Sequence, residues 1–124
     1  MNGNKLVADT SLIINLFNGN TLARDVIHQR QLWLSCITEI ELLSFPKLST
    51  SEKQLLNKFL SECVILDLTK TIRDATIEIR SSYQLKNPDA IIAATAHYLD
   101  LPLVTFDHDF KKIENLDLVL LEND

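Results

Sequence analysis

Four acidic residues spread along the chain have the chemistry of a metal site: Asp9, Glu41, Asp89 and Asp107. Carboxylates that lie close together raise one another's pKa values and destabilise a fold, so such a group needs a positive partner. Carboxylate and water ligands suit Mg²⁺ or Mn²⁺. A pair of these ions can activate a water molecule and stabilise the leaving oxygen of a phosphodiester. The residue types therefore point to metal-assisted cleavage of a nucleic acid.

The elements that must position these acids alternate between apolar runs of strand length and helical segments. We expect strands at residues 5–8, 32–37, 64–68, 101–106 and 116–121. We expect helices at residues 12–17, 21–30, 39–43, 50–60, 69–85 and 90–96, of which the first is apolar nearly all round and so buried. Alternation with short connections predicts an α/β fold with a central, mainly parallel sheet of four to five strands flanked by helices.

In such sheets the functional crevice lies outside the carboxyl ends of the strands, where the strand order changes direction. Asp9 ends the first expected strand and caps the helix after it, and Asp107 follows the fourth strand immediately. Glu41 lies on the helix that follows the second strand, with Thr38 as its expected N-cap. The sequence alone thus places Asp9 and Asp107 at one edge of the sheet, and Glu41 has a comparable position after the second strand.

Asp89 reaches the same region from a helix start. Asn87 is a favoured N-cap and Pro88 is favoured at the first helical position, so Asp89 falls in the first turn of the helix. An acid at this position is favourable in any helix because the N-terminus carries partial positive charge.

Length and composition narrow the class of protein. A chain of 124 residues that is 46% hydrophobic predicts a single domain over residues 1–124 with its own core. Its apolar runs are too short to span a bilayer, and its first residues do not resemble a signal peptide, so we expect no membrane association and a cytoplasmic location. Cys36 and Cys63 lack metal or redox spacing and are expected to be buried, reduced thiols.

The formal net charge of −5 argues at first against a nucleic-acid partner. Without the four acids the rest of the chain carries −1, and bound metal ions would make the crevice favourable to phosphate. Cations that could assist at such a crevice are Arg80, Lys86, Lys111 and Lys112, of which we assign Arg80 and Lys86 to substrate binding.

Four blocks of the sequence, in order, resemble the PIN-domain family. They are VADTS at 7–11, ITEIELL at 37–43, PDAIIAATA at 88–96 and LVTFDHDF at 103–110. The third block is the most specific, and together the blocks span nearly the whole chain. The resemblance is greatest to small VapC-like members, which are toxins of toxin-antitoxin pairs, and it implies a three-layer sandwich.

What the resemblance implies for function is an endoribonuclease that depends on Mg²⁺ or Mn²⁺ and cleaves an RNA substrate. It also implies a cognate antitoxin protein as partner and a homodimer. An antitoxin contributes a helix or an extended segment to an apolar groove, and the helix at 12–17 could form one side of it.

The resemblance also assigns roles to individual residues. It implies that the catalytic and metal-binding acids are Asp9, Glu41, Asp89 and Asp107. Thr105 or Ser11 would support them, and Asp109 would be either a further ligand or a helix cap.

Three other functions are open to a domain with acids at a sheet edge. A receiver-like signalling domain needs an acidic pair at the first strand and a lysine after a late strand, and here Asp9 stands alone. An aspartyl phosphatase needs two aspartates around one residue at that point, where this chain has Asp9, Thr10 and Ser11. A PIN domain that binds RNA or a partner without cleaving remains an alternative, because family membership does not fix activity.

Overall fold

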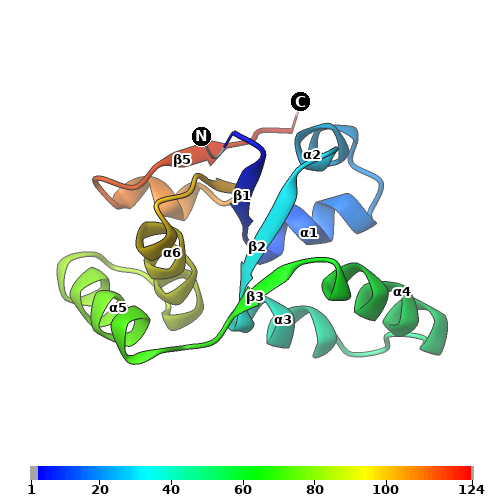
Figure 1. Ribbon diagram of the computed structural model, residues 1–124, viewed down its shortest axis with the longest axis horizontal. Helices are drawn as coiled ribbons and strands as arrows, with labels where there is room; N and C mark the ends of the chain where they lie inside the picture. Colours follow the sequence, from blue (N-terminus) through cyan, green and yellow to red (C-terminus); the bar gives the residue numbers. More distant parts are fainter. Residues whose placement is uncertain (1–2, 124) are drawn as a thin grey trace.

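The computed structural model describes residues 3–123 and is organised around one five-stranded sheet (Figure 1). Its strands are β1 (Lys5–Ala8), β2 (Gln31–Ser35), β3 (Val64–Leu66), β4 (Leu103–Thr105) and β5 (Leu118–Leu120). They lie in the order β3-β2-β1-β4-β5, and each neighbouring pair is parallel. The predicted α/β fold is confirmed, with five strands and a fully parallel sheet.

Helices cover both faces of the sheet, which gives the three layers seen in Figure 1. One face carries α1 (Thr10–Phe17), α2 (Thr21–Ile27), α3 (Cys36–Leu43) and α4 (Thr50–Ser61). The other carries α5 (Lys70–Ser82), α6 (Asn87–Leu99) and a 3₁₀ helix, η1 (His108–Lys112). Within residues 3–123, no helix is long and apolar enough to cross a membrane.

Alternation along the strands divides the apolar residues between the two faces, as the period of two in a strand requires. In β1, Leu6 and Ala8 pack into the cluster under α1–α4, whereas Val7 packs into the cluster under α6. In β4, Leu103 and Val104 divide in the same way. These strands are buried on both faces, which explains why each is a continuous apolar run in the sequence.

Two predicted helix caps are wrong. Helix α3 begins directly at the end of β2, with Ser35 as its N-cap, so Thr38 lies inside the helix and is fully buried. Helix α6 spans Asn87–Leu99, so it begins before and ends after the predicted range of 90–96, and Lys86 holds the predicted N-cap position of Asn87 without a side-chain capping bond. Asn87 is therefore already helical, but Asp89 still lies in the first turn as expected.

Other expectations hold only in part. Helix α1 is present, but only Leu12 and Ile13 are buried, and Phe17 is 46% exposed, so the prediction of a helix buried all round is wrong. Four strands are shorter than predicted, because Cys36 and Ile37 belong to α3, and β3, β4 and β5 cover only part of their apolar runs. Cys36 and Cys63 are unpaired thiols as predicted, but they are only partly buried.

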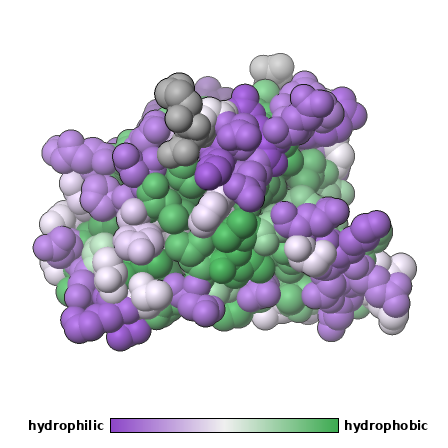
Figure 2. Space-filling model, viewed as in Figure 1, coloured by the Kyte–Doolittle hydropathy of each residue, from purple (hydrophilic) through white to green (hydrophobic). Residues whose placement is uncertain are grey.

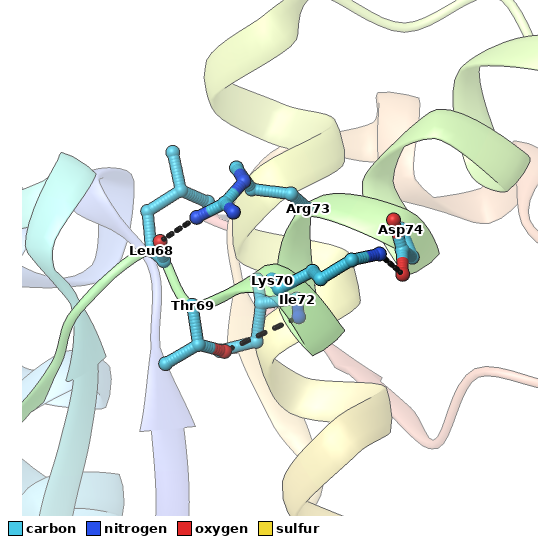
Figure 3. A network of polar contacts seen from close by, with 6 residues as sticks. All are labelled: Leu68, Thr69, Lys70, Ile72, Arg73 and Asp74. Atoms are coloured by element: carbon cyan, nitrogen blue, oxygen red, sulfur yellow. Dashed lines mark hydrogen bonds and ion pairs between the residues drawn. The ribbon is translucent and has the colours of Figure 1, made fainter.

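The crossover from β3 to α5 carries the chain from one face of the sheet to the other, and Figure 3 shows the contacts that start α5. The Thr69 hydroxyl accepts a hydrogen bond from the N–H of Ile72, and Arg73 Nη1 donates to the Leu68 carbonyl at 2.9 Å. The N-cap and the hydrogen bond to the Leu68 carbonyl together fix where α5 begins. They thereby fix the path of α5 toward α6.

Candidate metal centre

Asp9 is the most constrained acid of the site. It follows β1, caps α1 by accepting from the N–H of Leu12 at 2.9 Å, and is only 3% exposed. The hydroxyls of Ser11 and Thr105 also donate to its carboxylate, at 2.8 and 2.5 Å. Burial raises the pKa of Asp9 above its usual value, and these three donors partly offset that rise. Three donors leave room on a carboxylate, with about four acceptor positions, for one further ligand.

Thr105 links two of the acids. It is the last residue of β4 and is fully buried. Its hydroxyl donates to Asp9 and accepts from the backbone N–H of Asp107 at 2.9 Å. Ser11 adds a second link, because its hydroxyl also accepts from the N–H of Phe106 at 3.1 Å. The ends of β1 and β4 are therefore held together by side chains at the point where the strand order changes direction.

Asp89 is half-buried in the first turn of α6, and one of its carboxylate oxygens lacks a hydrogen bond within residues 3–123. Among the described residues its Oδ2 atom is buried without a hydrogen-bond partner. Burial raises the pKa of Asp89 to about 6, and the charge of Asp107 adds to the rise. A buried carboxylate oxygen without a donor is unfavourable unless something outside the protein satisfies it.

Asp107 and Asp109 complete a group with Asp89. One carboxylate oxygen from each of the three lies within 4.8 Å of the others. Asp107 caps η1 by accepting from the N–H of Asp109 at 2.9 Å, and this turn directs the two acids to the same place. Of the two roles expected for Asp109, the helix cap is filled by Asp107, and Asp109 lies in the carboxylate cluster.

Glu41 and Asp9 lie outside that group of three but near it, since both of their charges raise the pKa of Asp89. Glu41 is held by the hydroxyl of Thr10, which donates to Oε1 at 2.6 Å and also contacts the Thr38 hydroxyl at 3.3 Å. The sequence did not reveal this link between α1 and α3. Its signal was the threonine directly after Asp9, at the start of a helix.

The group fits a hard divalent cation on the chemistry of its donors. All of its ligand atoms are carboxylate oxygens, the preferred donors of Mg²⁺ and Mn²⁺. The Oδ2 atom of Asp89, which has no hydrogen-bond partner within residues 3–123, is the observation that favours a cation there. A divalent ion would also relieve the repulsion among the neighbouring charges that raises the pKa of Asp89.

Of the cations expected to assist, Arg80, Lys86 and Lys112 line one groove together with Asp109. Lys111 is exposed and is not among its lining residues. His108 lies beside Asp107 in sequence, but its Nε2 atom is 3.3 Å from a carboxylate oxygen of Glu122.

The fold and the site together define an α/β domain with a carboxylate cluster at the carboxyl edge of a parallel sheet. The sequence matches the PIN domain family over residues 6–116, and the chain belongs to that family. No curated protein matches the sequence significantly.

Solved structures agree with this assignment. A chain of a toxin-antitoxin complex from Klebsiella pneumoniae is 31% identical, with a TM-score of 0.84 over 95% of this chain and 99% of the other. A chain of VapBC2 from Rickettsia felis, bound to a DNA fragment from the promoter, is 23% identical with a TM-score of 0.79 and the same coverage. A chain of DNA-bound VapBC from Salmonella typhimurium is 23% identical with a TM-score of 0.77, over 93% of this chain and 96% of the other. The last two establish the fold alone, and the first also supports the family.

Proposed function

We propose that this protein is a metal-dependent endoribonuclease that acts in the cytoplasm as the toxin of a toxin-antitoxin pair. The observation that supports the nuclease proposal is that Asp89 is clustered with Asp107 and Asp109, and that its buried Oδ2 has no hydrogen-bond partner in the part of the chain that the structure describes. The toxin proposal is supported by the similarity to a chain of the Klebsiella complex.

In this proposal Asp89, Asp107 and Asp109 hold Mg²⁺ or Mn²⁺, and Asp9 and Glu41 lie beside them as further ligands. A divalent ion bound there would activate a water molecule and stabilise the negative charge that develops on the cleaved phosphate. The protein contributes fixed positions for the carboxylates. Thr105 and Ser11 orient Asp9, and Thr10 orients Glu41.

The test is cleavage of total cellular RNA by the purified protein in Mg²⁺, Mn²⁺ or EDTA, with the fragment ends mapped. We expect discrete cuts that need metal and that disappear in Asp89→Asn. Asp25→Asn is the matched control, because Asp25 is an exposed acid of α2 whose side chain is 72% accessible. Equal cleavage by the wild type and Asp89→Asn would contradict the site assignment.

An apolar groove of about 290 Å³ between α1, α3 and α4 supports an antitoxin as partner. Ile13 and Leu42 form part of its lining, and Phe17, Phe45 and Leu55 line it while 43–63% exposed. Large apolar side chains left in water on both sides of a groove favour an occupant that buries them. We assign this groove to an amphipathic segment of the antitoxin.

This assignment predicts a separation of two properties. Phe45→Asp should keep the nuclease activity, because Phe45 lines the apolar groove and is not one of the clustered acids, but should lose inhibition by the antitoxin. The assay is growth of cells that express the protein together with its antitoxin. If Phe45→Asp is rescued as fully as the wild type, the groove is not the antitoxin site.

A homodimer is also proposed. Figure 2 shows hydrophobic side chains gathered in the centre of one face, over β2 and β3, with hydrophilic side chains around them. β3 is an edge strand, and all three of its residues are only partly buried. Such a surface is suited to a second copy of the chain. Light scattering should give twice the chain mass of 14.1 kDa, and a monomer mass at high concentration would contradict it.

The second candidate function is a PIN domain that binds RNA without cleaving it. In that case metal would still raise the melting temperature of the wild type and not that of Asp89→Asn, while RNA would stay intact in every metal. The thermal shift and the cleavage assay together separate the two functions.

A further inference from the structure

A groove with a volume of about 510 Å³ lies beside the carboxylate cluster and is lined by Arg80, Lys86 and Lys112 together with Tyr83 and Asp109. We call it the basic groove. We propose that the basic groove binds backbone phosphates of the RNA substrate that lie next to the phosphate at the cleavage site. This inference rests on the proposed nuclease function and names how that site takes its substrate.

The basic groove and the carboxylate cluster share a wall. Asp109 belongs to both, since it lines the groove and lies within 4.8 Å of Asp89 and Asp107 through its carboxylate. Lys86 precedes Asp89 by one helical turn, and its charge opposes the rise in the pKa of Asp89. A strand whose scissile phosphate lay at the cluster would therefore continue directly along the groove.

The charge of the groove is opposite to that of the protein. The chain carries −5 overall, but the groove has three cations and a single carboxylate among its lining residues. Phosphate contacts by Lys and Arg supply most of the affinity for a nucleic-acid backbone. An acidic protein that handles RNA needs such a local exception, and this one adjoins the candidate site.

Two of the cations are held in place by the loop between α5 and α6. Arg80 Nε donates to the Leu85 carbonyl at 3.1 Å, and Lys112 Nζ donates to the Gln84 carbonyl at 3.2 Å. The bond of Arg80 uses Nε, so both Nη groups remain to make paired contacts with phosphate oxygens. Cations that are already positioned lose less side-chain entropy when the ligand binds.

The experiment measures binding apart from cleavage. The affinity of the full-length protein for a labelled, short, single-stranded RNA of random sequence is measured by fluorescence anisotropy in EDTA, between about 50 and 200 mM salt. The test variant is Lys86→Gln/Lys112→Gln, and Arg80→Gln is added to it in a triple variant. The matched control is Lys53→Gln/Lys58→Gln, which removes the same charge from α4, outside the groove.

We expect the slope of log affinity against log salt to fall by about 0.7 for each lost phosphate contact, or about 1.4 for Lys86→Gln/Lys112→Gln. The control should keep the wild-type slope. Melting curves identify any loss of fold in the triple variant, and the double variant then decides alone. Equal slopes in the double variant and the control would overturn the proposal, and so would a wild type that does not bind RNA.

A peptide rich in aspartate and glutamate serves as the competing probe. If it binds as tightly as RNA and loses affinity in the same variant, the groove belongs to an acidic protein segment and the proposal is wrong. A wild type that binds RNA through the groove but cleaves nothing in Mg²⁺ or Mn²⁺ contradicts only the nuclease function. A wild type that cleaves while Lys86→Gln/Lys112→Gln matches the control contradicts only the groove.

Discussion

Replacing Asp89 by asparagine should stabilise the metal-free protein at neutral pH. Burial and the charge of Asp107 raise the pKa of Asp89 from 3.8 in the unfolded chain to about 6 in the folded protein. The folded state therefore holds a proton that the unfolded state has released between these two pH values. Stability falls as pH rises through this window, and above about pH 6 the full penalty of the buried charge remains.

The size of the penalty follows from the shift. Each pKa unit corresponds to about 1.4 kcal/mol, and because Asp89 is only half-buried, solvent screening reduces the total to about 1–2 kcal/mol. Asparagine keeps the shape of the side chain and removes the charge. For a chain of this length that gain should raise the melting temperature at pH 7 in EDTA by about 3–10 °C.

The assay is thermal unfolding followed by circular dichroism at pH 4 and pH 7, in EDTA and in Mg²⁺. The difference should fall to a small part of its pH 7 value at pH 4, where the carboxyl is protonated in the folded state and about half protonated in the unfolded chain. Saturating Mg²⁺ should reverse the order, because an ion at 100 times its dissociation constant adds about 2.7 kcal/mol to the wild type alone. Asp25→Asn should stay within about 0.5 kcal/mol of the wild type throughout. An Asp89→Asn protein that melts at or below the wild type at pH 7 in EDTA would show that the charge of Asp89 does not destabilise the fold.

Two further variants test how the site is held. Thr105→Val keeps the shape of the side chain but removes the donor to Asp9 and the acceptor for the Asp107 N–H. It should lower the free energy of unfolding, measured by urea titration, by about 1–3 kcal/mol, and it should lower metal-dependent cleavage. Phe110→Ala leaves a cavity at a fully buried position in η1 and should lower the free energy of unfolding by about 3–5 kcal/mol. It should also weaken Mg²⁺ binding, measured by calorimetry, because Asp109 lies on the same turn. A Thr105→Val protein with unchanged stability, or a Phe110→Ala protein with unchanged metal affinity, would contradict these roles.

Strands β1 and β4 were predictable because they are buried on both faces and leave continuous apolar runs. The position of Asp9 at the end of β1 was predictable for the same reason, since an acid directly after such a run marks the strand end. The strand ends themselves were less so. Leu101 is buried and apolar but precedes β4, because burial alone does not require pairing with a neighbouring strand.

The helix caps show where local sequence preference fails. Thr38 has the residue type of an N-cap, but α3 starts as soon as β2 ends, and Ser35 is the first side chain in position to cap it. Lys86 takes the cap position of α6 without a side-chain bond, so cap preference could not identify it. The approach of Asp109 to Asp89 depends on the 3₁₀ turn after β4, which has no periodic pattern to read.

The bonds of Thr105 bear on how such a protein would be controlled. The carboxylate of Asp9 and the backbone at Asp107 are already held by the protein's own donors and acceptors, so these positions would be set before a metal ion bound. A site assembled in this way would need no rearrangement after the chain has folded. Inhibition would then act by blocking access to the carboxylate cluster, and release of the inhibitor would set the onset of activity.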